Sequence, residues 1–208
     1  KTGYLKGITT YRSGTMTTVL SVKEDTQKDA KKIIKTTAPK RGKELLGEIN
    51  HITISGHRYY VAIGLLNEDI YEIFASSNHD SDGEIVIPKN IKYGKIVKEC
   101  KGKYLFYSDC GKCFDLTNGH TNETVDSLTR IISCSLRHGA DISVVVSQLA
   151  KTKGPMLSFA KVLSRTLKKY IQDGTEAHGE ECPSCGSNKL IFQEGCVKCP
   201  SCGFSKCS

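Results

Sequence analysis

Six of the ten cysteines of this 208-residue chain lie in its last 27 residues, in a pattern that suits a metal ion. The phrase Cys-Pro-Ser-Cys-Gly occurs twice, beginning at Cys182 and at Cys199. Two thiolates three residues apart can reach one ion from a tight turn, and the glycine that follows permits a left-handed backbone that turns N–H groups toward sulfur. The pattern predicts a structural zinc site, and the ligands that it favours are Cys182, Cys185, Cys199 and Cys202.

The remaining two cysteines of this region admit more than one interpretation. Cys196 has the same spacing from Cys199 as Cys202 has, so Cys196 could replace Cys202 as a ligand, although the repeated proline and glycine favour Cys202. Cys196 and Cys207 are then unassigned. They are either incidental thiols or a pair that exchanges disulfides, because Lys198, Lys206 and a nearby zinc ion would favour the thiolate form. The residues alone leave both interpretations open.

The other four cysteines show no such pattern. Cys110-Gly-Lys-Cys113 has no second pair near it to complete a zinc site, and no βαβ pattern indicates a thioredoxin-like fold, so the sequence favours a β-turn with two ordinary thiols. Cys100 and Cys134 are isolated. Because the chain shows no secretion signal, we expect a reducing, cytoplasmic setting rather than a disulfide scaffold.

Candidate strands precede candidate helices along the chain, which predicts an α+β fold. Alternation and turn residues predict strands over residues 5–11, 16–22, 48–55, 59–66, 71–75, 85–87, 95–97 and 103–107. Two to three helices should follow, the first capped by Asn122, the second by Asp141 and the third spanning residues 156–172. The buried stripe expected for the first helix is Val125, Leu128, Ile131, Ile132 and Leu136. The C-terminal zinc ribbon, with a strand at 190–194, completes the expected architecture.

The charge of the chain is moderately basic, with a formal net charge of +8. Four thiolates on one zinc ion would lower it to roughly +6. Lysine and arginine gather mainly in residues 23–43 and are mixed with acidic residues, which favours a solvated linker over a phosphate-binding stripe. A basic zinc ribbon could bind nucleic acid, but this one offers only Phe192 and Phe204 as stacking aromatics, so nucleic acid is not the expected partner. No apolar run approaches the ~20 residues that span a membrane.

Several segments resemble adenosylcobalamin-dependent (class II) ribonucleotide reductases, in the order of that family. Lys6-Gly-Ile-Thr-Thr-Tyr-Arg12-Ser-Gly-Thr15 resembles the segment that closes the catalytic barrel. The segments similar to the small domain after the barrel are Arg41-Gly-Lys-Glu-Leu45, Tyr71-Glu-Ile-Phe-Ala75, Leu128-Thr-Arg-Ile-Ile-Ser133 and Ser135-Leu-Arg-His-Gly139. Residues 156–174 resemble the helix that follows, and residues 193–207 resemble the cysteine-rich tail.

The resemblance implies a role in deoxyribonucleotide biosynthesis. Members of the family reduce ribonucleotides by thiyl-radical chemistry that starts from cobalamin in the barrel, and a cysteine pair there is oxidised in each turnover. The resemblance implies that Cys182, Cys185, Cys199 and Cys202 bind zinc. It also implies that Cys196 and Cys207 carry reducing equivalents from thioredoxin or glutaredoxin to the oxidised pair. The implied partners are the protein's own barrel, one of these reductants and a ribonucleoside diphosphate or triphosphate bound by the barrel.

The resemblance also suggests how the chain is divided. We expect the end of the barrel at 1–22, a charged linker at 23–44, an α+β domain at 45–151, a connecting helix at 152–176 and the zinc ribbon with its redox-active tail at 177–208. The chain does not open with Met, so the radical cysteine and the cobalamin contacts are expected before Lys1. The polypeptide alone should then reduce no nucleotide, and detectable turnover would refute this. The competing hypotheses are a nucleic-acid-binding ribbon and a purely structural C-terminal module.

Overall fold

The computed structural model describes residues 36–79, 86–117, 122–177, 179 and 181–207. The strands predicted at 5–11 and 16–22, and most of the linker predicted at 23–44, lie outside the described residues.

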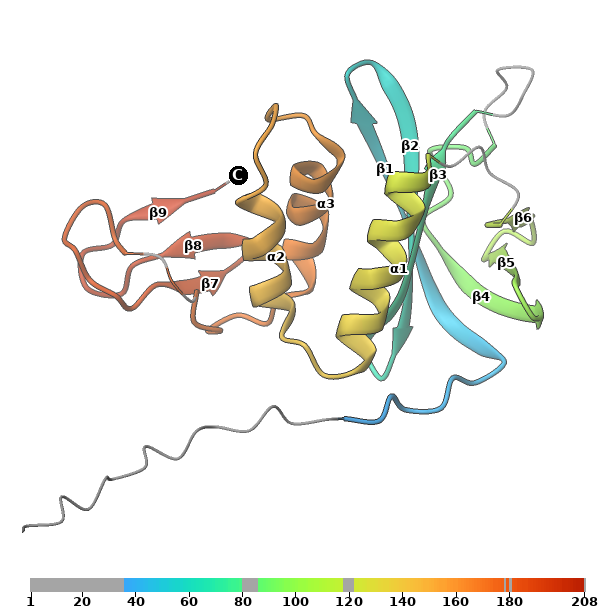
Figure 1. Cartoon of the computed structure of the whole chain (residues 1–208), viewed down its shortest axis with the longest axis horizontal. Helices are drawn as coiled ribbons and strands as arrows, with labels where there is room; N and C mark the ends of the chain where they lie inside the picture. The colour runs from blue at the N-terminus through green and yellow to red at the C-terminus, as the bar shows by residue number, and fades with distance from the viewer. Residues whose placement is uncertain (1–35, 80–85, 118–121, 178, 180, 208) are drawn as a thin grey trace, which may run out of the picture. The chain divides into compact units, whose positions relative to one another are not determined.

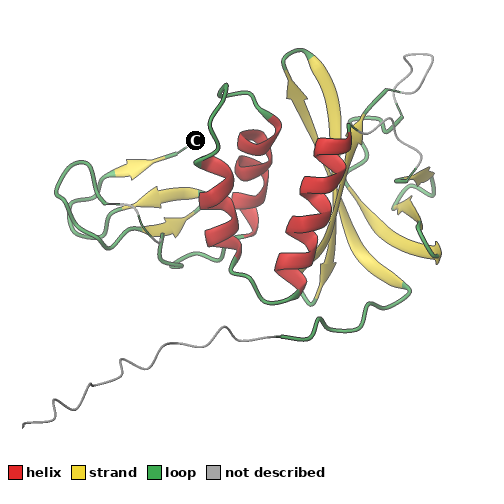
Figure 2. Cartoon of the chain, viewed as in Figure 1, coloured by secondary structure: helices red, strands yellow, loops and turns green. Residues whose placement is uncertain are grey.

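A β-rich part precedes three helices and a small ribbon, which confirms the predicted α+β class (Figures 1 and 2). The first six strands form one antiparallel sheet in the order β3-β2-β1-β4-β5-β6. Their bounds are β1 Glu44–Ile54, β2 His57–Leu66, β3 Asp69–Ser77, β4 Tyr93–Cys100, β5 Lys103–Ser108 and β6 Cys113–Asp115. The helices are α1 Glu123–Arg137, α2 Ile142–Ala150 and α3 Phe159–Leu167, and the 3-10 turn Lys168–Tyr170 follows α3. The ribbon sheet has the order β7-β8-β9, with bounds Ile191–Gln193, Cys196–Lys198 and Ser205–Lys206.

Three glycines lie side by side across the middle of the large sheet. Gly47 of β1 pairs with Gly64 of β2 on one side and with Gly94 of β4 on the other. A Cβ atom on Gly94 would lie 2.1 Å from the carbonyl oxygen of Tyr107, and one on Gly47 would lie 2.9 Å from the ring of Phe106. The glycines therefore let the strands approach closely, and Phe106 fills the space as a fully buried core residue.

Helix α1 covers the edge strand β3. The Asn122 side chain caps α1 by accepting a 2.9 Å hydrogen bond from the Thr124 N–H, as predicted. The predicted buried stripe is wrong at Ile131, which is 65% exposed, whereas Thr129 and Ser133 are buried. The physical reason is that α1 turns Ser133 toward strand β3, where its hydroxyl accepts a 2.9 Å hydrogen bond from the Ile73 N–H. An apolar side chain at this position would leave that donor unpaired. Ile131 lies two residues before Ser133 and therefore points to the opposite side of the helix.

A predicted helix and a predicted strand differ from the structure. Helix α3 spans Phe159–Leu167 rather than residues 156–172: Met156 is 70% exposed in the loop before it, and the 3-10 turn Lys168–Tyr170 follows it. The strand predicted at 85–87 is a loop at Val86 and Ile87, and residue 85 lies outside the described part. The Asn78 side chain replaces the strand pairing, because it accepts from the Ile87 N–H and donates to the Ile87 carbonyl, both at 2.8 Å. The backbone groups of the buried Ile87 are therefore paired although Ile87 lies in a loop.

A buried ion pair joins the segment before β1 to β3. The Arg41 guanidinium contacts both carboxylate oxygens of Glu72, at 2.6 and 2.9 Å, and the two side chains are 10% and 6% exposed. Arg41 also donates to the carbonyls of Gly42 and Lys43. Gly64 leaves room for the pair, since a Cβ atom there would lie 2.7 Å from Cγ of Glu72. The ion pair thus fixes how the chain enters the sheet.

Replacing Arg41 with methionine is expected to lower the free energy of unfolding by about 3–5 kcal/mol, because the Glu72 carboxylate would be buried without a partner. Urea denaturation measures this change. The matched control is Lys95→Met, which breaks the exposed pair between Lys95 and Glu44 and should cost less than about 1 kcal/mol. Equal, small effects of the two substitutions would contradict the structural role of Arg41.

Candidate metal centre and tail disulfide

Two turns of identical sequence and matching hydrogen bonds carry the four clustered cysteines. In the first turn, the backbone carbonyl of Cys182 accepts a hydrogen bond from the Gly186 N–H at 2.8 Å, and the backbone N–H of Cys182 donates to the Ser187 carbonyl at 2.9 Å. In the second turn, the backbone carbonyl of Cys199 accepts from the Gly203 N–H at 2.9 Å, and the backbone N–H of Cys199 donates to the Phe204 carbonyl at 2.8 Å. Both glycines have positive φ, +69° and +76°, as the repeated Cys-Pro-Ser-Cys-Gly phrase predicts.

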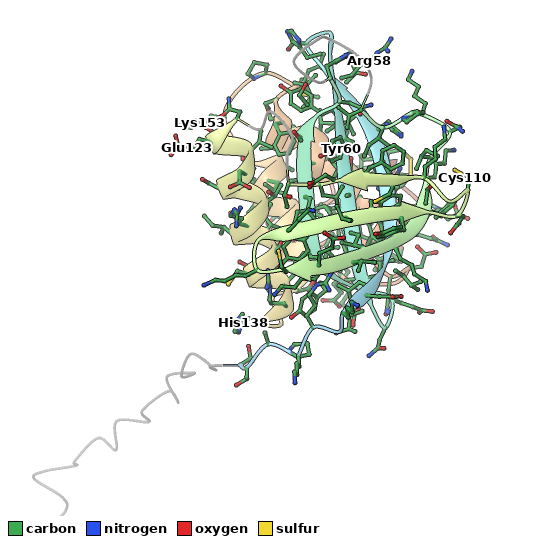
Figure 3. All side chains as sticks on the ribbon, turned by 90° about the vertical axis from the view of Figure 1, so that its right-hand side faces the viewer. Arg58, Tyr60, Cys110, Glu123, His138 and Lys153 are labelled. Atoms are coloured by element: carbon green, nitrogen blue, oxygen red, sulfur yellow. A yellow bond between two sulfur atoms is a disulfide. The ribbon has the colours of Figure 1, made fainter. Side chains whose placement is uncertain are left out.

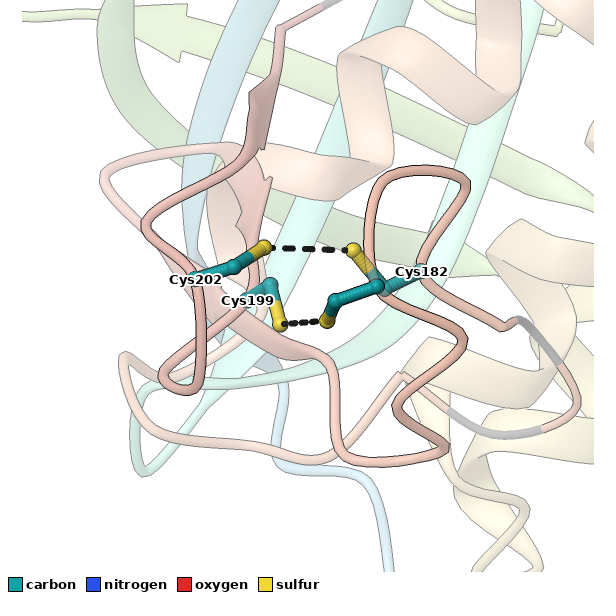
Figure 4. Close-up of side chains that lie close together, drawn as sticks. Cys182, Cys199 and Cys202 are labelled. Atoms are coloured by element: carbon teal, nitrogen blue, oxygen red, sulfur yellow. Dashed lines mark hydrogen bonds between the residues drawn. The ribbon is translucent and has the colours of Figure 1, made fainter.

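The two turns face each other and bring four sulfur atoms together (Figure 4). The Sγ atoms of Cys182 and Cys202 lie 3.6 Å apart, as do those of Cys185 and Cys199, and all four ligand atoms lie within 4.8 Å of one another. A tetrahedral zinc ion with bonds of about 2.3 Å would separate its sulfur ligands by roughly 3.8 Å. The four cysteines can therefore hold a metal ion such as zinc. The first cysteine of each turn is buried and the second is exposed, so the centre lies at the surface of the ribbon.

The thiols of this cluster are poised to lose protons unequally. Burial raises the pKa of Cys199, but N–H groups of Cys202 and Ser201 and its sulfur contacts outweigh burial and lower that pKa to about 6. At Cys185 the Ser187 N–H lowers the pKa, but thiol contacts with Cys202 and Cys182 outweigh it and raise that pKa to about 12. Of these two thiols, Cys199 is therefore the one that becomes a thiolate first, and the thiolate is the form that binds a metal ion.

Cys196 and Cys207 form a disulfide and take no part in the cluster. Strands β8 and β9 pair Val197 with Lys206 and Lys198 with Ser205, so the same register continued by one residue sets Cys196 opposite Cys207. Their Cα atoms are 4.4 Å apart, the spacing of a pair without hydrogen bonds between its members in an antiparallel sheet. The cluster contains Cys202 rather than Cys196, so the structure does not bring together the alternative ligand set.

The ribbon shares its core with the helices before it. The backbone N–H of Phe192 donates to the Thr175 carbonyl at 2.8 Å, and the Phe192 carbonyl accepts from the Gly174 N–H at 2.7 Å. The backbone N–H of Ala177 donates to the Leu190 carbonyl. The ribbon residues Cys182, Leu190, Phe192, Val197 and Cys199 belong to one buried cluster with residues of α2 and α3. Packing therefore fixes the base of the ribbon, including the strand that carries Cys196 and the clustered cysteine Cys199 that follows it.

The other cysteines lie apart from the cluster. Cys110 occupies the turn between β5 and β6, labelled in Figure 3, and is exposed, as is Cys113. A hydrogen bond from the Ser108 hydroxyl, with a sulfur–oxygen distance of 3.2 Å, lowers the pKa of Cys110. A β-turn is present at this motif, since the Gly111 N–H donates a 2.9 Å hydrogen bond to the Ser108 carbonyl three residues before it. Cys100 and Cys134 are exposed single thiols.

The family of the chain follows from its similarity to known sequences. Residues 45–172, more than half of the chain, match the model of the NrdJ homologue C-terminal domain, and the chain belongs to that family. It is therefore a C-terminal portion of a class II ribonucleotide reductase of the NrdJ type. No curated protein and no solved structure matches it. The six cysteines from Cys182 to Cys207 lie beyond the matched residues, so their roles rest on their own geometry.

Within the described residues, the longest helix has 15 residues, and no helix is long and apolar enough to cross a membrane.

Proposed function

We propose that this chain passes reducing equivalents from thioredoxin or glutaredoxin to the active-site disulfide of a class II ribonucleotide reductase, through the pair Cys196 and Cys207. The observation that carries the proposal is the division of six neighbouring cysteines into a four-sulfur cluster and a separate disulfide. A ribbon that served only as a structural clip would need the cluster alone. The disulfide adds a group that two electrons can open and close.

The zinc ion proposed for Cys182, Cys185, Cys199 and Cys202 would have a structural task. Four sulfur ligands leave no open position for a substrate, which is typical of structural rather than catalytic zinc. Cys199 follows β8 directly, and β8 begins at Cys196, so the metal would fix the strand on which the disulfide is built. The ribbon would thereby present the disulfide from a rigid base.

The chemistry on the nucleotide belongs, in this proposal, to the barrel. Adenosylcobalamin supplies the radical there when it is bound, and we assign to it none of the residues that the structure describes. A ribonucleoside diphosphate or triphosphate is the proposed substrate, and the reducing cytoplasm is the proposed setting, because thioredoxin and glutaredoxin are kept reduced in that compartment.

The reduction of the isolated chain by a thioredoxin system tests the proposal. The oxidised chain, mixed with thioredoxin, its reductase and NADPH, should consume about one NADPH per chain and then stop, because one disulfide takes two electrons. The variant Cys196→Ser/Cys207→Ser should consume none, while Cys110→Ser/Cys113→Ser should behave as the parent chain.

Failure of thioredoxin and of glutaredoxin to reduce the disulfide, under conditions in which dithiothreitol reduces it, would overturn the proposal. The purely structural module would then be the better account. A nucleic-acid role gains no support from the ribbon, since Phe192 is buried in the core and cannot stack on a base.

A further inference from the structure

The two sulfur atoms of the tail disulfide lie in unequal surroundings. Cys196 belongs to β8, the central strand of the ribbon sheet, and pairs with Gln193 of β7 on the side away from Cys207. It is half-buried. Cys207 follows the edge strand β9 and is exposed. Within the described residues, no strand pairs with the outer side of β9.

The direction of the disulfide decides how each sulfur can be reached. Thiolate attack on a disulfide is in line, so that the entering sulfur, the attacked sulfur and the leaving sulfur lie near one axis. The disulfide joins the central strand β8 to the residue after the edge strand β9, so each sulfur is approached from the side away from its partner. Attack on Cys207 therefore comes from outside the sheet edge, whereas attack on Cys196 has to come from above β7, on the side where Gln193 lies.

From this geometry we infer that Cys207 is the sulfur that the external reductant attacks, and that Cys196 is the sulfur that leaves as a thiolate. The inference rests on the proposed function and adds to it the order in which the bonds break. The reductant's first thiolate forms a bond to Sγ of Cys207 as the bond between Cys207 and Cys196 breaks, and the electron pair goes to Sγ of Cys196. The reductant's second thiolate then attacks its own first sulfur and expels the Cys207 thiolate. The reductant is oxidised to a disulfide by two electrons, and the tail gains two thiols.

One cation lies on the same face of the ribbon sheet as Cys196. The side chains of β8 alternate between the two faces of the ribbon sheet, so Cys196 and Lys198 lie on one face and the buried Val197 on the other. The Lys198 ammonium pairs with Glu194 at 3.4 Å, at the exposed side of the hairpin. Because Glu194 already pairs with this ammonium, the order of attack rests on the exposure of Cys207 and on the position of Cys196 in the central strand.

Trapping of the mixed disulfide tests the inference on the unmodified chain. The oxidised chain is mixed with a thioredoxin whose second active-site cysteine is replaced by serine, so that the first covalent adduct persists. The reaction is quenched with acid at the shortest accessible times, before thiols exchange further, and the cross-linked peptides are identified by mass spectrometry. The same trap is applied with a glutaredoxin that lacks its second cysteine.

We expect the adduct on Cys207 in roughly tenfold or greater excess over the adduct on Cys196, extrapolated to zero time. An adduct that forms mainly on Cys196 would overturn the order of attack and leave the proposed function intact. If neither reductant forms an adduct on either cysteine, the proposed function fails, and the inference fails with it. In the variant Gln193→Ala, which opens the approach above β7, the share of adduct on Cys196 should rise; an unchanged share would contradict the steric argument.

Discussion

Replacing Cys199 with serine is expected to abolish zinc binding and to unfold the ribbon while the α+β part stays folded. Cys199 is 2% exposed, contributes one of the four clustered sulfur atoms, and makes both backbone hydrogen bonds that close the second turn. A serine hydroxyl is a poor zinc ligand, and structural zinc sites of this kind contribute roughly 10–16 kcal/mol of binding free energy to the folding of small domains. No other interaction in a segment of this size can replace that amount.

The zinc content by elemental analysis and the hydrogen exchange of the ribbon amides measure this effect. Zinc should fall from about one ion per chain to near zero. Amides of Gly186 and Gly203, which close the two cysteine turns by hydrogen bonds in the parent chain, should exchange rapidly in the variant. The matched control is Cys134→Ser, an exposed cysteine of α1, which should change neither quantity. Full zinc content in Cys199→Ser, or a ribbon that stays protected without zinc, would contradict the proposed metal centre.

In the full-length reductase, the variant Cys196→Ser/Cys207→Ser should lose multiple turnover with thioredoxin. The active-site pair can still act once, so product should stop at about one nucleotide per active site. Dithiothreitol, which is small enough to enter the barrel, should restore continuous turnover, because the substitutions leave the proposed zinc ligands and the proposed barrel chemistry in place. Product formed against time with each reductant measures the difference.

One control variant and two single variants complete this experiment. Replacement of Cys110 and Cys113, the other C-x-x-C pair, should leave turnover with thioredoxin unchanged. Each single variant, Cys196→Ser and Cys207→Ser, should fail like the double variant, because a disulfide shuttle needs both sulfur atoms. Normal turnover of the double variant with thioredoxin would show that the ribbon is a structural module and that another route reduces the active site.

The sequence predicts the parts of this site that depend on local spacing. Two thiols and a glycine within five residues define each of the two cysteine turns, so the four clustered cysteines could be selected before the fold was known. The opposition of Cys196 and Cys207 could not be derived from the residues, since it depends on the register of β9, a strand of two residues without a periodic pattern. The residues left the pair open between incidental thiols and disulfide exchange, and the family resemblance favoured exchange.

In the fold too, local features could be predicted and contacts between distant residues could not. The caps Asn122 and Asp141 were predictable because each acts on a backbone N–H two residues away. The ion pair between Arg41 and Glu72 joins residues 31 positions apart, and the contact of Ser133 with Ile73 spans 60 positions. Polar residues that satisfy distant backbone groups or buried charges have no signature in periodicity, which is why the buried face of α1 was predicted wrongly at Ile131.

A joint assay of zinc and of cysteine connectivity, on the chain after mild oxidation, tests most directly whether the six cysteines divide into four metal ligands and one redox pair. Zinc is counted by elemental analysis, and cross-linked cysteine peptides are mapped by mass spectrometry. We expect the chain to retain about one zinc ion and to form a disulfide between Cys196 and Cys207 that thioredoxin reduces. Loss of zinc on oxidation, or a disulfide that involves Cys199 or Cys202, would contradict the division of the six cysteines into four metal ligands and one redox pair.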